Sequence, residues 1–515
     1  MALALLIGTQ IVTANAAVVT FRQLSGGSNP DFARGIFIDS NHIYVVGETA
    51  SFGPNTPNLF LSIFRLDNSH KCSVAVDLGS GIFERGWRVV AYGGNVYVSG
   101  DTNYGANPYN VLLVKFNTNC DVLDAEVYDI DGSDLPFGLS ISPDGSTLYI
   151  AGSSTSAAHL LAVRTSDFSV AWAKLFKVTG GGDEAYSVTF SGNKLYVTGG
   201  TSTGDLFVSR FDAAGNHEAS KVFSTPQNEE GRDVVVVGGK VYVAGNYNDP
   251  VKQREFLFMR LDTNLNLELP KTFGTNVIDE VSSLSMVGGL AYAVGMSRFF
   301  GSDDAALFAV DPSTGDLSHA FVLAREAPWV QNAQDSASTG TCLIYTGFSD
   351  NWPAFYGVLD AVTAGTISFT ISSPSPSITT PPVTPAFPTP TAAGFTPTFN
   401  TPAAGDAFYS WFCPDALVVS TTTTTSSTTT TLTQTATTTR TDTTTLTQST
   451  TYSTTTTLST TLTHSTTTTL STTTTSTQYF AEPVTTYVLP ALLAVIAALL
   501  GASLVVGRRR RSFPY

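Results

Sequence analysis

The stretch Gly-Asn-Lys-Leu-Tyr-Val-Thr-Gly at residues 192–199 contains the phrase that decides the fold of this chain. A Gly or Asn turn, an apolar residue, Tyr, further small or apolar residues and Gly recur seven times between residues 41 and 347. Their spacing of 46 to 53 residues indicates a repeat architecture, with each tyrosine in the core between sheets. The repeated tyrosines are Tyr44, Tyr97, Tyr149, Tyr196, Tyr242, Tyr292 and Tyr345.

Each repeat contains four strand signals. A β-branched run such as Val234–Val237 meets the Tyr strand through a tight Gly-Gly, Gly-Asn or Asp-Gly turn, which is typical of a β-hairpin. A third run, such as Leu206–Phe211, and a weaker fourth, such as Glu218–Phe223, follow. Four antiparallel strands per repeat, without a helical period, predict an all-β fold. Seven such repeats predict a seven-bladed β-propeller over residues 17–371.

Two segments compete to complete the last blade of this ring. Val18–Leu24 has the pattern of a fourth strand and stands before the first repeat. Thr366–Ile371 has a similar pattern after the last repeat. We favour the N-terminal segment, and we expect Phe355–Leu359 as the third strand of the seventh repeat.

The repeat also resembles a known family. The Tyr phrase is followed by Phe-Val-Ser-Arg-Phe-Asp-Ala-Ala-Gly-Asn at residues 207–216, and Ser-Pro-Asp-Gly occurs at residues 142–145. These motifs resemble the SBBP-type β-propeller repeat and related repeats of archaeal and other microbial surface proteins. The resemblance covers residues 18–371 and is weakest in the seventh repeat. It implies a propeller on a stalked cell-surface protein, and repeats of this kind indicate fold far better than function.

The two ends of the chain indicate export and a membrane anchor. Residues 1–16 are apolar and end in Ala-Asn-Ala, which is typical of a signal peptide, although a buried first strand is an alternative. Residues 484–507 include twenty uncharged residues from Val488, enough to span about 30 Å as a helix. The arginines in the tail 508–515 predict a cytoplasmic end, so the protein is expected to cross the membrane once with the rest outside. A cleaved sorting signal is the alternative.

Three segments connect the repeats to this anchor. Residues 372–404 are rich in Pro, Thr and Ser and predict an extended linker. Residues 405–419 contain a cluster of aromatic residues, which we expect to dock on the propeller. Residues 420–483 are dominated by threonine and predict a disordered stalk, with extended strand pairing as the alternative.

Charge and composition exclude several classes of function. The chain has 41 acidic and 26 basic residues, which argues against binding of nucleic acid. No two of its six histidines stand at metal-ligand spacing. A Gly-x-Ser-x-Gly match at residues 200–204 lies in a loop between strands, where it does not form a nucleophile elbow. The sequence thus predicts no catalytic residue.

One charged feature recurs in every repeat. An acidic residue precedes each innermost strand, usually 13 residues before the Tyr, and we expect the seven to line one mouth of a central channel. They could bind Ca²⁺ or sugar hydroxyls there. A structural role is the preferred alternative, with blade-to-blade ion pairs to the bases Arg65, Lys115, Arg164, Arg210 and Arg260. These ring acids are Asp31, Glu84, Asp134, Asp183, Glu229, Asp279 and Asp335.

The four cysteines are expected to be oxidised in an exported protein. We favour the pairs Cys72–Cys120 and Cys342–Cys413, because the first joins neighbouring repeats and the second joins the aromatic segment to the last repeat. A free Cys342 and an unpaired Cys413 form the alternative.

Two classes of function fit these features. The first is a non-enzymatic binding, adhesion or cell-envelope module, held on a stalk and contacting a surface polymer or protein. The second is a surface-tethered carbohydrate-active enzyme, a glycosidase or lyase, that uses carboxylates at the channel mouth. The regularity of the repeats favours the first class. No cofactor is expected apart from the Ca²⁺ considered above.

Overall fold

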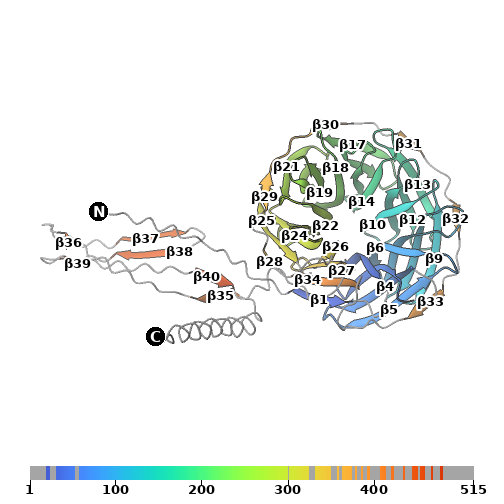
Figure 1. The fold of residues 1–515 in the computed structure, drawn as a ribbon, viewed down its shortest axis with the longest axis horizontal. Helices are drawn as coiled ribbons and strands as arrows, with labels where there is room; N and C mark the ends of the chain where they lie inside the picture. Colours follow the sequence, from blue (N-terminus) through green and yellow to red (C-terminus); the bar gives the residue numbers. More distant parts are fainter. Residues whose placement is uncertain are drawn as a thin grey trace, which may run out of the picture. The chain divides into compact units, whose positions relative to one another are not determined.

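The computed structural model of the chain describes residues 30–52, 57–299, 301–323, 331–349 and 362–373, together with short strands between and beyond them. Val19–Phe412 form one compact unit. Six antiparallel sheets of this unit are the blades of a β-propeller and surround a common centre (Figure 1). Among the described residues no helix is long and apolar enough to cross a membrane. Residues 1–16 and 484–515 lie outside them.

Each blade uses four consecutive strands of the chain, from the innermost to the outer one. The first three blades are β2–β5 (Asp31–Ile38, His42–Thr49, Asn58–Arg65, His70–Asp77), β6–β9 (Glu84–Tyr92, Asn95–Thr102, Asn110–Asn117, Val122–Asp129) and β10–β13 (Leu135–Ile141, Thr147–Ser153, Ala158–Arg164, Val170–Lys177). The next three are β14–β17 (Glu184–Ser191, Lys194–Gly200, Leu206–Asp212, His217–Ser224), β18–β21 (Glu229–Val237, Lys240–Asp249, Gln253–Asp262, Leu267–Gly274) and β22–β25 (Asp279–Val287, Leu290–Ser297, Asp304–Val310, Leu317–Leu323).

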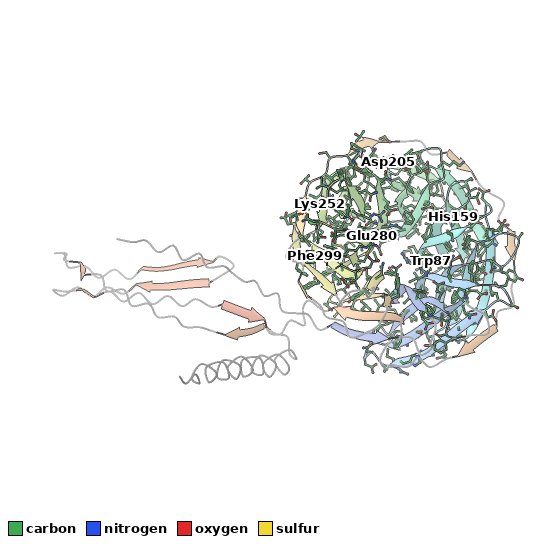
Figure 2. All side chains as sticks on the ribbon, viewed as in Figure 1. Trp87, His159, Asp205, Lys252, Glu280 and Phe299 are labelled. Carbon is green, nitrogen blue, oxygen red and sulfur yellow. A yellow bond between two sulfur atoms is a disulfide. The ribbon has the colours of Figure 1, made fainter. Side chains whose placement is uncertain are left out.

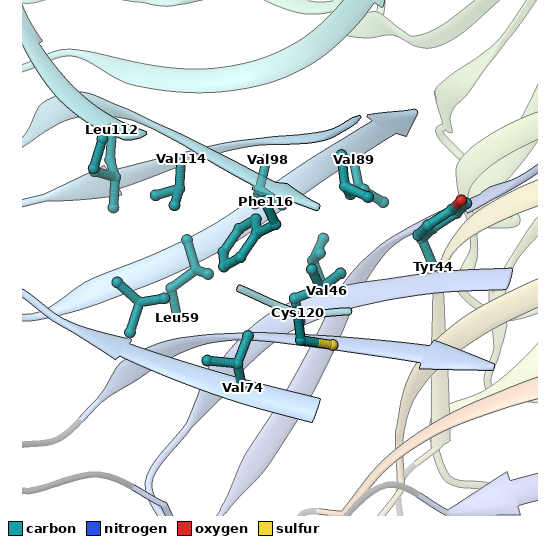
Figure 3. Close-up of a cluster of buried hydrophobic side chains, with 14 of the residues drawn as sticks. Tyr44, Val46, Leu59, Val74, Val89, Val98, Leu112, Val114, Phe116 and Cys120 are labelled. Atoms are coloured by element: carbon teal, nitrogen blue, oxygen red, sulfur yellow. The ribbon is translucent and has the colours of Figure 1, made fainter. Parts of the chain in front are cut away.

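The core lies between neighbouring blades. Both faces of the second and third strands are covered, so these strands are continuous apolar runs rather than alternating ones. Figure 3 shows one such layer, in which Phe116 of the second blade packs among Leu59 and Val74 of the first. The repeated tyrosines, from Tyr44 to Tyr345, are all buried in these layers.

A fifth strand at the outer edge of each blade comes from residues 357–394, which we call the belt. After the repeats the chain runs back past the blades in reverse order and pairs antiparallel with each outer strand. Figure 1 shows these short strands at the rim. From the sixth blade to the first they are β28 (Gly357–Val358), β29 (Thr363–Gly365), β30 (Thr370–Ser372), β31 (Ser377–Thr379), β32 (Thr384–Ala386) and β33 (Thr391–Gly394).

The belt corrects three expectations. Gly357–Val358, expected in the third strand of the seventh repeat, is instead the edge strand of the sixth blade. Thr370–Ser372, which overlaps the second candidate for closing the ring, is the edge strand of the fourth blade. Part of the expected linker 372–404 belongs to the propeller. The belt strands are only two to four residues long and pair with the outer strands of distant blades. A Pro-rich composition does not reveal such pairing.

A further four-stranded sheet combines three distant parts of the chain. Its order is β26 (Gln331–Ser338), β27 (Leu343–Ser349), β34 (Asp406–Phe412) and β1 (Val19–Gln23). The aromatic segment therefore supplies its third strand, in the place where residues 355–359 were expected. The N-terminal segment supplies the outer strand and pairs antiparallel with β34.

The Thr-rich segment belongs to a separate unit. Three antiparallel pairs occur within it: β35 (Val419–Thr422) with β40 (Ser476–Tyr479), β36 (Thr433–Gln434) with β39 (Thr466–Thr467), and β37 (Thr444–Ser449) with β38 (Ser453–Leu458). The described residues of the segment thus show the strand pairing that the sequence left open beside a disordered stalk.

The first two blades are joined by a disulfide. Cys72 and Cys120 are bonded, with their Cα atoms 6.0 Å apart, and this is the pairing that the sequence favours. Cys342 is also disulfide-bonded. Its expected partner, Cys413, lies outside the described residues, so the second pairing stays a prediction.

Candidate binding site at the centre of the propeller

The innermost strand of each sheet carries a β-bulge. In β14 the register with β15 shifts between Ala185 and Ser187, which leaves Tyr186 as an extra residue. The same shift occurs at the corresponding place in the innermost strands of all seven sheets. The extra residues are Arg34, Trp87, Phe137, Tyr186, Arg232, Ser282 and Gln334.

The repeated glycine of the Tyr strand is explained by this bulge. At Gly199 a Cβ atom would overlap the carbonyl oxygen of Glu184, two residues before the bulged Tyr186. All seven repeated glycines meet the equivalent carbonyl in the same way. The glycine that makes the repeat recognisable in sequence is therefore the residue that lets the bulged strand lie close to its neighbour.

Five of the bulged side chains form an arc across five neighbouring blades. The Arg34 guanidinium lies 4.5 Å from the centre of the Trp87 ring, and the Trp87 and Phe137 rings are 5.6 Å apart. Phe137 and Tyr186 are 5.4 Å apart, and the Arg232 guanidinium lies 4.4 Å from the Tyr186 ring. Stacking of this kind fixes the side chains in place, since aromatic and cation–π pairs each add favourable energy.

The arc borders a cavity of about 390 Å³, which we call the central cavity. Innermost strands of six sheets line it, and Figure 2 shows Trp87 and Glu280 near the centre of the ring, with Phe299 toward the rim. The lining residues are Trp87, Arg88, Phe137, Glu184, Tyr186, Arg232, Glu280, Val281, Ser282, Asn332 and Gln334. This size is within the range of small-molecule sites.

The charges around the cavity are paired with one another. Glu230 binds Arg232 at 2.9 Å and lies 3.7 Å from Arg254, which also pairs with Glu280. On the other side of the arc, Arg34 pairs with Glu48. The Tyr186 hydroxyl donates to Glu184, and burial and this carboxylate raise the pKa of Tyr186. Arg88 of the wall lies 4.0 Å from Asp335, so that Glu184 is the one charged lining residue without an ion pair among the described residues.

A network of buried polar groups connects the innermost strands. Asp233 accepts hydrogen bonds from the Ser187 hydroxyl and the Leu284 N–H, both at 2.7 Å, and so joins three blades. The Ser283 hydroxyl lies 3.1 Å from carboxylate oxygens of both Asp233 and Asp335. Burial raises the pKa of both aspartates. The network holds the bulged strands in a fixed arrangement.

Six of the predicted ring acids stand at the first residue of an innermost strand or directly before it, and each accepts hydrogen bonds from the backbone of adjoining loops. Asp183 accepts hydrogen bonds from the backbone N–H of Thr179 at 3.2 Å and of Ser202 at 2.9 Å. Backbone donors to the others are Ala50 and Ser51 for Asp31, Leu78 for Glu84, Ile130 and Asp131 for Asp134, Thr225 for Glu229, and Thr275 for Asp279. From the second blade onward, one of these backbone donors belongs to the segment that connects the preceding blade to the blade of the acid, so the hydrogen bond holds that segment in place.

These ring acids are buried and separate. Burial raises the pKa of Glu84 to about 8 and that of Glu229 to about 7, and it also raises the pKa of Asp31, Asp134 and Asp279. In the described part of the chain, no three His, Cys, Asp or Glu side chains gather as metal ligands would. Six of these acids thus hold the backbone of adjoining loops, and their structural role stays a prediction.

The expected ion pairs between the ring acids and the third-strand bases do not occur among the described residues. Instead, these bases reach carbonyl oxygens in turns. Lys115 donates to Thr165 of the next blade at 3.2 Å, and Arg260 donates to Pro312 of the next blade at 2.8 Å. A guanidinium or ammonium satisfies a loop carbonyl as well as a carboxylate, so sequence register alone did not identify the partner.

Asp335 is the exception among the ring acids. Asp335 lies one residue after the bulged Gln334. Asp233 occupies the same position in β18, one residue after the bulged Arg232. The residue equivalent to the other ring acids is Gln331, which pairs with Ser349 as Asp279 pairs with Ser297. Counting back from Tyr345 misplaced it, because the equivalent position holds Gln331 instead of an acid and Tyr345 stands two residues before its glycine, where the other tyrosines stand three before theirs.

The similarity of this chain to known proteins is structural. No protein-family pattern and no curated protein matches the sequence. Solved structures do match. A structure described as the Dos1 propeller has 11% identity and a TM-score of 0.46, over 76% of this chain and 95% of that one. A putative 6-phosphogluconolactonase from Bacteroides uniformis has 12% identity and a TM-score of 0.40, over 59% of this chain and 95% of that one.

Proposed function

We propose that this chain is a binding module of the cell surface that presents the central cavity of a seven-bladed β-propeller to an extracellular ligand. In this proposal the sheet formed by β26, β27, β34 and β1 is the seventh blade. The observation that carries it is the arc of bulged side chains. Five of the seven equivalent bulged positions hold large side chains, three aromatic rings and two arginines, and the three rings and Arg232 line one cavity.

The location follows from the ends of the sequence. The signal peptide at 1–16 exports the chain, the helix at 484–507 anchors it in the membrane, and residues 420–483 hold the propeller away from the surface. The SBBP-type resemblance of the repeats fits such a protein. An envelope polymer or a protein of another surface is the partner expected in this setting, with adhesion or envelope assembly as the role.

The test uses the full-length chain, purified in detergent and immobilised. Parent protein and a Tyr186→Ala variant are exposed to arrays of oligosaccharides and of peptides. We expect binding of at least one class, lost in the variant. Mass spectrometry of bound probes over time distinguishes binding from the enzyme alternative, which requires cleavage. If no probe depends on Tyr186, the proposed binding function is wrong.

A further inference from the structure

We infer that the central cavity binds a neutral saccharide, through an aromatic wall on one side and an amide and hydroxyl wall on the other. The inference rests on the proposed binding function and specifies its ligand. A pyranose ring has a face of C–H groups and an edge of hydroxyl groups. The cavity offers a counterpart to each of these two surfaces.

The aromatic wall comes from three neighbouring blades. Trp87, Phe137 and Tyr186 are consecutive members of the arc and all line the cavity. Their positions are fixed at both ends, because Trp87 donates its indole N–H to Asp101 and the Tyr186 hydroxyl bonds Glu184. Rings held in this way lose little freedom on binding, which favours affinity.

The polar wall comes from sheets further along the ring. Ser282, Asn332 and Gln334 line the cavity from β22 and β26. Gln334 donates from its amide nitrogen to the Asn332 side-chain oxygen at 2.7 Å. This bond leaves the Gln334 oxygen, the Asn332 nitrogen and the Ser282 hydroxyl without a partner among the described residues. They provide an acceptor, a donor and a group that serves as either, as sugar hydroxyls require.

The charge arrangement selects against strongly charged ligands. Arg232 is already bound to Glu230, and Glu280 to Arg254. An anionic ligand would have to compete with Glu230 for Arg232, and it would also approach Glu184 and Glu280 of the wall. A cationic ligand would face Arg88 and Arg232 in the same cavity. A neutral ligand avoids both costs, since it disturbs none of these ion pairs.

A second cavity suggests that more than one sugar unit is bound. It has a volume of about 170 Å³ and shares Glu184 and Tyr186 with the central cavity. Its wall includes the side-chain amides of Asn228 and Asn248, together with Asn246, whose amide is bound to Glu230 and to the Val281 N–H. An oligosaccharide that passes Tyr186 would therefore meet a further set of hydrogen-bonding groups, which favours an oligomer over a single sugar.

The experiment uses the full-length chain on an array with neutral hexose and N-acetylhexosamine oligosaccharides, uronic-acid and sulfated oligosaccharides, and short peptides. Calorimetry then measures the strongest neutral probe. Tyr186→Ala should weaken its binding at least about tenfold, and Tyr186→Phe, which keeps the ring, should weaken it far less. Gln334→Ala should weaken binding about threefold to tenfold through lost hydrogen bonds. Phe299→Ala, at the rim, serves as the control and should bind as the parent does.

The outcomes separate this inference from the proposed function. Binding of charged saccharides or peptides alone, with dependence on Tyr186, would overturn the neutral-saccharide inference and leave the binding function intact. Binding that is unaffected by both Tyr186→Ala and Gln334→Ala would overturn both. Thermal melts of each variant show whether the protein is folded. If Tyr186→Ala melts early, the result for Gln334→Ala decides, because the half-buried Gln334 amide hydrogen-bonds only Asn332 among the described residues.

Discussion

Asp335 of the last sheet accepts a hydrogen bond at 3.0 Å from the backbone N–H of Ile36 in the first blade, 299 positions earlier in the chain. The same carboxylate lies 3.1 Å from the Ser283 hydroxyl of the sixth blade. One buried side chain thus joins the last sheet to both of its neighbours, at the place where the two ends of the repeat array meet.

Replacing Asp335 should weaken the propeller at this junction. Asp335→Ala leaves the Ile36 N–H without its acceptor, and we expect the free energy of unfolding to fall by ~1–3 kcal/mol. Asp335→Asn keeps one acceptor oxygen and removes a buried charge, so its effect should be smaller. Urea denaturation measures both. Equal stability of Asp335→Ala and the parent would show that the junction does not depend on this bond.

The repeated glycine offers a sharper test. In Gly199→Ala the new Cβ would overlap the Glu184 carbonyl, so either β14 or β15 must move, and we expect a loss of at least ~2 kcal/mol. Gly182→Ala in the same blade is the matched control, because a Cβ there meets no atom within 4 Å. Comparison of the two melting temperatures checks the effect. Similar values would argue against the tight approach of the two strands.

The buried glutamates predict a pH dependence. The pKa of Glu84 is about 8 in the folded protein, above the ordinary value of 4.5, so the folded state holds a proton that the unfolded state releases. Stability from this group is therefore full below about pH 4.5 and is lost as pH rises through 8. We expect the melting temperature to fall between pH 6.5 and 8.5.

Glu84→Gln should flatten this dependence, since the amide is neutral at every pH. The window above pH 6.5 avoids the opposite contribution of His159, whose pKa burial lowers to about 3. At pH 8 the variant should unfold at a temperature equal to or above that of the parent. A variant with the full slope of the parent would show that Glu84 is ionised in the folded state.

Asp183 tests whether the ring acids are structural. Asp183→Asn keeps one acceptor oxygen but loses charge-assisted bonds to Thr179 and Ser202, and we expect a loss of ~1–3 kcal/mol. Millimolar Ca²⁺ should leave the melting temperatures of parent and variant unchanged. A rise with Ca²⁺ in the parent alone would instead identify a metal site at this loop.

The cysteines can be mapped directly. We expect peptides of the unreduced protein to contain Cys72 joined to Cys120, as in the structure, and Cys342 joined to Cys413. The first bond closes a separation of 48 residues and should stabilise by ~4 kcal/mol in the chain-entropy model. Alkylation of Cys413 without a reductant would contradict the second pairing.

The repeat determined how much of the fold was predictable. Each Tyr phrase reports a strand that is buried on both faces, such as β15, and its flanking turns report the hairpin partners. These are local signals, so the strands of the six blades could be placed from sequence. The belt could not, because β31 or β32 has only three residues and obtains its partners from distant edges. Thr or Ser at every seventh position from Thr363 to Thr391 was the available signal.

The candidate binding site could be predicted from the sequence only in part. The acids were recognised because they recur at a similar distance from the Tyr, and six of them accept hydrogen bonds from the backbone of adjoining loops. The bulged residues stand three positions after six of the ring acids, as Tyr186 follows Asp183, but they share no chemistry, so a search for recurring residue types passed over them. Variation at a fixed position of a repeat was the better sign of a binding surface.

The reversed order of the belt strands also determines the order in which the blades can be completed during synthesis. A chain synthesised from its N-terminus contains the strands of all six blades before the first belt strand, β28, is made. The belt strands then pair first with the outer edge of the sixth blade and last with that of the first blade. The last sheet receives its third strand only with Asp406–Phe412. A chain cut at residue 371 would leave the outer edges of the first three blades unpaired and open to other strands. Synthesis must therefore reach residue 412 before the strands of all seven sheets are present.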